Sequence, residues 1–287
     1  MLLHITECPR DAMQGIKEPI ATTLKIAYLK KLIEAGFPVI DAGSFVSASA
    51  IPQMADTKEV FDALLDVNAS SEILAIVANQ RGAEEAATHP LVSVLGYPFS
   101  VSETFQLRNT NATIADSFNR LKAIQEICLE RGKKLRVYLS MAFGNPYGDA
   151  WNEELVGEMA MKMSELGITS IALADTIGNS TPELIRSLYL AIRKTLPTNV
   201  ELSLHLHSRP DEVFAKMDAA WDAGCRHIDS ALLGFGGCPM ASDTLTGNMA
   251  TESILAWCNA RGIDHKIDAI AMQEAQNLAS GIFHAPN

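Results

Sequence analysis

Residues 153–174 read EELVGEMAMKMSELGITSIALA, and this stretch decides the fold because it holds one complete copy of a pattern that recurs along the chain. Residues 153–166 place apolar side chains at helical spacing and predict an amphipathic helix. Gly167 follows, where the residue that ends a helix often takes a left-handed conformation that suits glycine. Residues 170–174 form a short apolar run, which predicts a buried strand.

The same pattern extends from this stretch toward both ends of the chain. Short runs rich in Val, Ile and Leu predict eight strands, at residues 2–7, 39–42, 73–77, 91–95, 135–141, 170–174, 200–206 and 227–232. Amphipathic segments predict eight helices, at residues 22–35, 57–65, 81–88, 114–130, 153–166, 182–195, 211–223 and 251–260. Continuously apolar strands are typical of parallel sheets, in which both faces are buried.

Eight strand–helix units in 287 residues predict an α/β fold, a (β/α)8 or TIM barrel that forms one domain over residues 1–287. The alternative is an open doubly wound sheet, for which a Gly-rich turn is expected after the first strand. The residues at that place are CPRD, positions 8–11, which do not form such a turn. A further amphipathic segment, at about residues 266–284, predicts an additional C-terminal helix.

Composition excludes several classes of partner. The formal net charge of −11 repels phosphate backbones, so we expect no nucleic acid partner. No apolar run approaches the roughly 20 residues that cross a bilayer, so we expect no membrane association. Five cysteines, an odd number without a Cys-x-x-Cys pair, favour a reducing compartment. Because residues 1–11 do not resemble a targeting segment, we expect a cytoplasmic protein.

In a barrel of this kind the carboxyl ends of the strands face the active site. Arg10 and Asp11 directly follow the first predicted strand, although a lone Arg-Asp pair is usually an ion pair in a turn. His205 and His207 end the seventh predicted strand, and their i, i+2 spacing points both imidazoles to one side. This arrangement lets both rings bind one divalent cation, and the alternative is two structural histidines.

The segment after the eighth predicted strand is GFGGCP, residues 234–239. Its glycines permit close approach to a ligand, and a cation nearby would stabilise the thiolate of Cys238, which could then move protons. The alternative is a surface turn with an inert cysteine. Asn248 could supply a neutral oxygen ligand to a hard cation, although a Gly-Asn pair is most often only a turn.

Asp41 and Asp175 end the second and sixth predicted strands, and Ser44 follows Asp41. Either carboxylate could orient a ligand or hold a water, but an ion pair at the barrel mouth is the commoner role. Together the candidates provide a carboxylate, two imidazoles and an amide oxygen. This mixed oxygen and nitrogen set predicts Mg²⁺ or Mn²⁺ rather than a thiolate zinc site.

Several segments resemble, in order, the motifs of the hydroxymethylglutaryl-CoA lyase family. They are CPRDAMQ (8–14), SFVS (44–47), PQM (52–54), NPY (145–147), DTIG (175–178), HLH (205–207), GGCP (236–239) and GNMATE (247–252). The resemblance spans nearly the whole chain, and GGCP is its most specific element. The HLH motif is shared with a wider group of barrel metal enzymes that includes isopropylmalate and homocitrate synthases.

The resemblance implies a barrel enzyme that cleaves a 3-hydroxy-3-methylglutaryl thioester into acetyl-CoA and acetoacetate. It also implies a homodimer and an acyl-CoA substrate. The cation ligands that it implies are Asp11, His205, His207 and Asn248.

The resemblance further implies roles in catalysis and substrate binding. Arg10 would stabilise the developing enolate, and Cys238 would act as acid and base from a mobile loop. Asp175 would assist proton transfer, and Asp41 stands at a catalytic position where the family usually has Glu. Arg10 itself would touch the substrate, and the other substrate contacts expected are Gln14 and Ser44.

One departure from the family pattern keeps other functions open. After the His pair the family usually has Asp-Thr-Tyr-Gly, whereas this chain has SRPD at residues 208–211, beside the expected cation. One alternative is a condensing enzyme or aldolase of the same barrel group, although the condensing relatives lack the GGCP loop. Another alternative is a barrel that binds metal or acyl-CoA without turnover.

Overall fold

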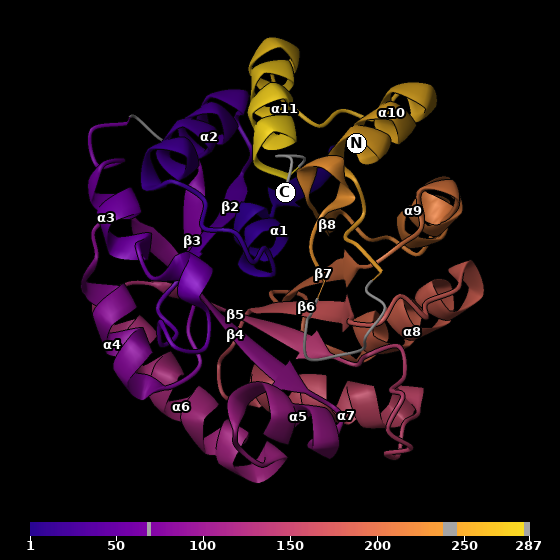
Figure 1. The fold of residues 1–287 in the computed structure, drawn as a ribbon. Helices are drawn as coiled ribbons and strands as arrows, with labels where there is room; N and C mark the ends of the chain where they lie inside the picture. The colour runs from indigo at the N-terminus through magenta and orange to yellow at the C-terminus, as the bar shows by residue number, and fades with distance from the viewer. Residues whose placement is uncertain (68–69, 238–245, 284–287) are drawn as a thin grey trace.

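The computed structural model describes residues 1–67, 70–237 and 246–283. In these residues eight parallel strands follow one another around a closed barrel, and β1 pairs with both β2 and β8 (Figure 1). The strands are β1 (His4–Glu7), β2 (Val39–Ser44), β3 (Glu72–Ile76), β4 (Val92–Ser100), β5 (Lys134–Ser140), β6 (Ser170–Asp175), β7 (Glu201–Leu206) and β8 (His227–Ser230). The predicted TIM barrel is therefore confirmed.

The helices lie outside the barrel wall, apart from the short α1, which lies at its carboxyl end (Figure 1). They are α1 (Pro9–Gln14), α2 (Thr22–Ala35), α3 (Thr57–Asp62), α4 (Gln80–Thr88), α5 (Glu103–Thr110), α6 (Ile114–Arg131), α7 (Glu153–Glu165), α8 (Pro182–Thr195), α9 (Val213–Asp222), α10 (Thr251–Arg261) and α11 (Ala269–Phe283). The sequence predicted all of them except α1 and α5.

Local sequence signals set the helix ends. Gly167 follows α7 with a φ of +82°, in the left-handed region expected for it. Thr181 precedes α8, and its side chain accepts a hydrogen bond from the backbone N–H of Leu184 at 3.2 Å. Pro182 occupies the first turn of α8, where its missing N–H costs nothing.

Alternation along the strands separates two cores. Ile73 and Ala75 of β3 belong to the large core between the strands and the outer helices. Leu74 and Ile76 alternate with them and belong to a small separate cluster that includes Tyr138 of β5, so this cluster fills the inside of the barrel. The apolar filling comes from β3, β4, β5 and β6, which leaves the side near β7, β8 and β1 to polar groups.

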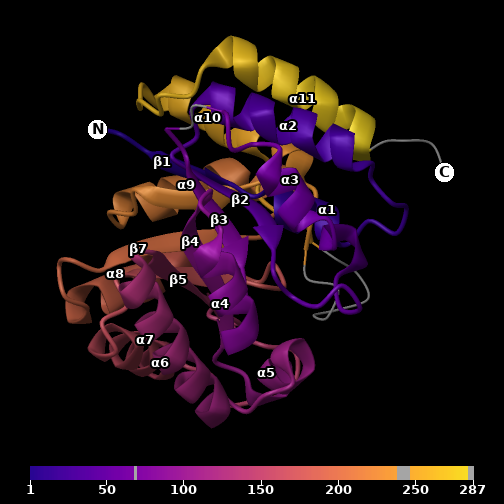
Figure 2. The same cartoon turned by 90° about the vertical axis from the view of Figure 1, so that its left-hand side faces the viewer.

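The predicted C-terminal helix is present as α11, which lies along α2 (Figures 1 and 2). Lys31 of α2 pairs with Glu274 of α11 at 2.8 Å. At the end of α11, Phe283 stacks on Phe235 of the segment after β8, with ring centroids 4.8 Å apart. The last helix therefore supports the same loop that the sequence placed at the barrel mouth. None of the helices in the described residues is long and apolar enough to span a bilayer.

Candidate active site

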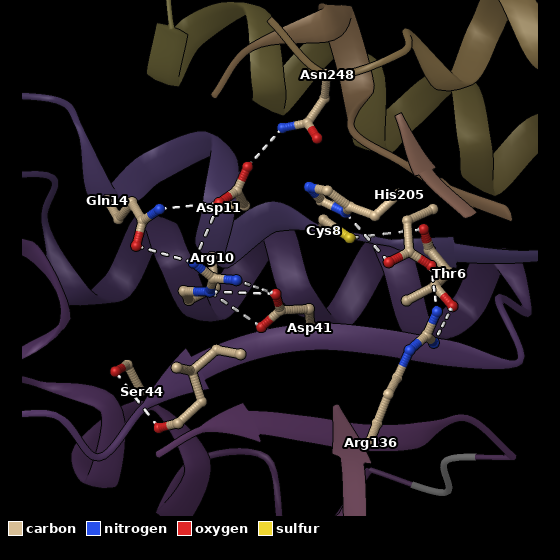
Figure 3. Close-up of polar contacts among 12 residues, drawn as sticks. Thr6, Cys8, Arg10, Asp11, Gln14, Asp41, Ser44, Arg136, His205 and Asn248 are labelled. Atoms are coloured by element: carbon tan, nitrogen blue, oxygen red, sulfur yellow. Dashed lines mark hydrogen bonds and ion pairs between the residues drawn. The ribbon is translucent and has the colours of Figure 1, made fainter. Parts of the chain in front are cut away.

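Helix α1 begins immediately after β1 and places three polar side chains at the carboxyl end of the barrel (Figures 2 and 3). Pro9 is its first residue, so Arg10 and Asp11 lie in the first turn of a helix. Arg10 and Asp11 are each 7% exposed. Gln14 follows one turn later, and its amide N–H donates to Asp11 Oδ1 at 2.8 Å.

Asp11, His205 and His207 bring one ligand atom each to within 4.8 Å of one another. Asn248 joins this cluster, because its amide Nδ2 donates to Asp11 Oδ2 at 2.7 Å (Figure 3). Its backbone also forms an isolated antiparallel bridge with His207. The four predicted cation ligands therefore lie together, although they come from α1, β7 and the segment before α10.

The loop after β8 lies unusually close to this cluster. Asn248 Nδ2 donates a second hydrogen bond, to the backbone oxygen of Phe235 at 2.9 Å. A Cβ on Gly236 would lie 2.4 Å from Asn248 Nδ2 and 2.9 Å from Asp11 Oδ2. Gly236 also has a φ of +108°, which side chains rarely allow. Only glycine therefore lets the loop approach two of the candidate ligands, Asn248 and Asp11, this closely.

The protonation states of Asp11 and His207 suit a cation. Burial opposes ionisation of Asp11, but Arg10 and the two imidazoles outweigh it and lower its pKa to about 2. Burial and the neighbouring His205 lower the pKa of His207 to about 4, so its ring is neutral at physiological pH. Burial also disfavours the charged form of His205, but a hydrogen bond to Asp229 outweighs it and raises the pKa of this ring.

These residues fit a divalent cation. Nδ1 of His207 is buried and has no hydrogen-bond partner among the described residues, which is costly for a polar atom unless a ligand satisfies it. An ionised carboxylate and a neutral imidazole are also the protonation states in which Asp and His bind metals. The set of one carboxylate, two imidazoles and one amide suits Mg²⁺ or Mn²⁺.

Arg10 is held beside the cluster by a second carboxylate. Its Nε donates to both oxygens of Asp41 at 3.1 Å, and its Nη1 donates to Gln14 Oε1 at 2.8 Å and to Asp11 Oδ1 at 3.2 Å (Figure 3). Burial alone would lower the pKa of Arg10, but Asp41 and Asp11 raise it. Arg10 therefore stays charged, and its orientation is fixed.

The cluster opens into a cavity at the barrel mouth. Its polar lining includes Arg10, Asp11, Gln14 and the two imidazoles. The rest of the lining is mixed: an apolar part includes Val46, Ile51, Ile76, Pro98 and Phe105, and the polar residues include Asn109, Tyr138, Ser140 and Thr176. A ligand in this cavity would have a polar head near the cluster and an apolar or neutral part against the apolar part of the lining.

Two of the predicted residues that the structure describes, Asp175 and Ser44, do not join this arrangement. Asp175 accepts hydrogen bonds from the backbone N–H groups of Asn179 and Ser180 at 2.8 and 2.9 Å, which fixes the loop after β6. Ser44 Oγ accepts from the N–H of Val46 at 3.2 Å and does not line the cavity. Cys238 lies outside the described residues. Their roles stay predictions.

Sequence reasoning missed two charged residues inside the barrel, Arg136 of β5 and Asp229 of β8. Each is at most 2% exposed, and they form an ion pair of 2.6 Å. The sequence did contain a signal for this pair, because each residue is charged and stands in an otherwise apolar strand. Charged residues are almost never fully buried without a partner, so each one indicates a partner inside the protein.

Comparison with known proteins identifies the family. A family model described as HMGL-like matches residues 4–279. The chain belongs to the HMGL-like family. Its relatives in this family include the mitochondrial hydroxymethylglutaryl-CoA lyase of Mus musculus, to which it is 35% identical over 93% of this chain and 81% of the mouse protein. The cytoplasmic 3-hydroxy-3-methylglutaryl-CoA lyase of Rattus norvegicus is 30% identical over 93% of this chain and 77% of the rat protein.

Solved structures of HMGL-like proteins show the same fold over the whole chain. An HMG-CoA lyase from Acinetobacter baumannii, in complex with coenzyme A and 3-methylmalate, has a TM-score of 0.91 and 30% identity, covering 99% of this chain and 92% of that one. A hydroxymethylglutaryl-CoA lyase from Pseudomonas aeruginosa also has a TM-score of 0.91, with 31% identity, covering 100% of this chain and 94% of that one.

Proposed function

We propose that this protein is a metal-dependent carbon–carbon lyase that cleaves 3-hydroxy-3-methylglutaryl-CoA, or a related 3-hydroxyacyl-CoA, into acetyl-CoA and a keto acid. The observation that carries the proposal is the cluster of Asp11, His205 and His207, next to a fixed Arg10 in one cavity. The names of the mouse and rat relatives support the choice of substrate. The coenzyme A in the Acinetobacter baumannii structure supports an acyl-CoA.

Cleavage requires that the 3-hydroxyl group lose its proton while negative charge develops on the thioester fragment. A Mg²⁺ or Mn²⁺ ion held by Asp11, His205, His207 and Asn248 would lower the pKa of that hydroxyl group. Arg10 would donate to the thioester oxygen as charge appears there, and its link to Asp41 means that little reorientation is needed. Gln14 lines the same cavity and would contact the substrate.

The enolate that leaves must then gain a proton. We assign both proton transfers to Cys238, which the family resemblance implies as acid and base: its thiolate would take the proton of the 3-hydroxyl group, and the thiol would then return it to the enolate. Asp175, at the end of β6, would assist. Gly236, in the described part of this loop, lies beside Asp11 and Asn248, and the role of Cys238 rests on the family resemblance. The apolar part of the cavity lining would hold the uncharged part of the acyl chain.

We further propose a cytoplasmic homodimer. The four cysteines in the described part of the chain are all free, which supports a reducing compartment. The relatives include both mitochondrial and cytoplasmic proteins. Sedimentation of the purified protein would establish the assembly, and fractionation of cells that express the natural gene would establish the location.

An assay for product tests the lyase directly. The purified protein would be incubated with 3-hydroxy-3-methylglutaryl-CoA and Mg²⁺ or Mn²⁺, and acetyl-CoA and acetoacetate would be measured. We expect both products in equal amounts, and no products after treatment with a chelator. Normal cation binding without cleavage of any 3-hydroxyacyl-CoA tested would contradict the proposal and would favour a barrel that binds without turnover.

A further inference from the structure

The ring of His205 also contacts a polar group on its side away from Asp11 and His207. Its Nδ1 lies 3.2 Å from Asp229 Oδ2. Asp229 is 1% exposed, and strand alternation places it inside the barrel, because its neighbour Ile228 belongs to the outer core. The imidazole is therefore held between the candidate cation site and a buried carboxylate.

Arg136 holds the other side of that carboxylate. Its Nη1 donates to Thr6 Oγ1 at 3.0 Å (Figure 3). Its Nη2 donates to Asp229 Oδ1 at 2.6 Å and to Ser203 Oγ at 2.8 Å. These contacts join β1, β5, β7 and β8. Both oxygens of Asp229 are therefore assigned to fixed partners, Arg136 on one side and His205 on the other.

This arrangement determines which nitrogen of His205 carries the proton. An arginine side chain only donates hydrogen bonds, so it keeps Asp229 oriented and favours its ionised form. An ionised carboxylate only accepts, so the neutral ring of His205 must donate through Nδ1 and leave a lone pair on Nε2. We infer that Asp229, fixed by Arg136, is a positioning residue that presents Nε2 of His205 to the divalent cation. The inference rests on the cation site of the proposed function.

A second metal site is the competing explanation, because Cys8, His205 and Asp229 also bring ligand atoms within 4.8 Å of one another. The contacts of Asp229 argue against it. A cation there would have to displace either the ion pair with Arg136 or the contact with His205. In addition, burial and nearby carboxylates raise the pKa of the Cys8 thiol, which opposes the thiolate that a metal would need.

Asp229→Asn tests the tautomer with little change in shape. Because Arg136 only donates, it would hold the amide oxygen, and the amide N–H would then face His205 Nδ1. Nδ1 would become an acceptor, which places the proton on Nε2 and blocks the lone pair. We expect the affinity for Mn²⁺, measured by electron paramagnetic resonance on protein first treated with a chelator, to fall about tenfold to a hundredfold.

The double variant Arg136→Met/Asp229→Asn distinguishes this explanation from simple loss of charge. Without Arg136 the amide is free to turn its oxygen toward Nδ1, so we expect the Mn²⁺ affinity to recover most of the loss. The matched control is Asp218→Asn, which removes a carboxylate from Arg261 and Trp257 outside the barrel, and its affinity should equal that of the wild type. Wild-type affinity in Asp229→Asn, or no recovery in the double variant, would overturn the inference.

A spectroscopic measurement keeps the test valid if the variants fold poorly. In wild-type protein stripped of metal, at a pH raised until the ¹⁵N chemical shifts of His205 show a neutral ring, those shifts should place its proton on Nδ1. A proton on Nε2 would refute the role of Asp229. This readout needs no cation, so failure of the wild type to bind Mn²⁺ would count against the proposed function alone.

Discussion

Arg10 lies between two carboxylates, and this placement limits what it can do. Asp41 takes the Nε side of the guanidinium, while Asp11 and Gln14 accept from Nη1. These bonds hold the guanidinium in one orientation. It can therefore stabilise negative charge only at the position toward which the fold directs it. In this chain Asp41 fixes that direction from β2.

Arg10→Ala should therefore reduce catalysis strongly. Loss of one fixed donor to a developing oxyanion is worth about 3 kcal/mol, so we expect kcat for thioester cleavage to fall about a hundredfold or more. Steady-state kinetics with 3-hydroxy-3-methylglutaryl-CoA would measure this. Arg186→Ala, which removes an exposed arginine paired with Asp222, is the control and should leave kcat unchanged. A similar kcat in both variants would rule out the role assigned to Arg10.

Glu7 is a buried carboxyl group outside the candidate site. It accepts hydrogen bonds from the backbone N–H of Leu232 at 2.8 Å and from Thr251 Oγ1 at 2.5 Å, which ties β1 to the segments after β8. Burial outweighs these bonds and raises its pKa from 4.5 to about 8. The folded protein therefore keeps a proton on Glu7 over a pH range in which the unfolded chain has lost it.

This shift predicts how stability depends on pH. Because the pKa in the folded protein is raised, the contribution of Glu7 is fully present below pH 4.5 and is lost as the pH rises to about 8. The slope from this group alone is at most about −1.4 kcal/mol per pH unit. Urea unfolding at several pH values should show that Glu7→Gln removes this slope. Parallel curves for the variant and the wild type would contradict the raised pKa.

At the level of single residues, strand alternation indicates which side chains of a strand share one face of the barrel wall. The His-x-His spacing correctly placed both imidazoles on one side of β7. The same rule assigns Asp229 to the inside of β8. It also places Asp175 on the same face of β6 as Leu173, which belongs to the outer core. Hydrogen bonds such as those from the backbone to Asp175 depend on loop conformation, which alternation does not determine.

At the level of elements, the loop after β8 makes the site depend on one glycine. Gly236 has no room for a Cβ beside Asn248 and Asp11. The sequence predicted that glycines here permit close approach to a ligand. The structure shows that Gly236 approaches two candidate cation ligands instead. The short α1 was not predicted as a helix, because its sequence PRDAMQ shows no repeated helical spacing of apolar residues.

Gly236→Ala should damage the cation site more than the fold. The new Cβ would push Asn248 and Asp11 apart and strain the backbone, which we expect to cost about 1–3 kcal/mol of unfolding free energy. Mn²⁺ affinity should fall at least about tenfold, because two ligands move. Isothermal titration calorimetry and thermal unfolding would measure the two effects.

Gly157→Ala is the matched control for this substitution. Gly157 lies within α7, and a Cβ there would meet nothing within 4 Å. Alanine is the better helix former, so this variant should gain up to about 1 kcal/mol of stability and bind Mn²⁺ normally. Normal Mn²⁺ affinity in Gly236→Ala as well would show that the loop does not position the ligands.

For the whole molecule, the barrel could be predicted because its signal is repeated eight times. An error of a few residues at one strand, such as the end of β4 at Ser100 rather than at residue 95, does not change the topology. The inside of the barrel could not be predicted in the same way. Which buried polar groups pair across it depends on the tilt and register of strands that are far apart in the sequence.

The cation should stabilise the whole barrel, because its candidate ligands come from both ends of the chain. A ligand that binds only the folded state at one hundred times its Kd adds about 2.7 kcal/mol to the free energy of unfolding. We expect Mn²⁺ to raise the thermal unfolding temperature of the wild type accordingly. In His207→Ala this increase should largely disappear, while the unfolding temperature without Mn²⁺ changes less. An equal increase in both proteins would place the cation elsewhere.

The wide separation of Asp11 and Asn248 in the sequence has a consequence for biosynthesis. A ribosome must deliver nearly the entire polypeptide before both side chains are available, and the Phe283 ring that supports the intervening loop emerges later still. Domains that fold during translation do so as units. An incomplete nascent chain of this protein would carry only some of the candidate cation ligands. The protein would therefore bind the cation at the last stage of its maturation. A chain released early from the ribosome would lack the cation.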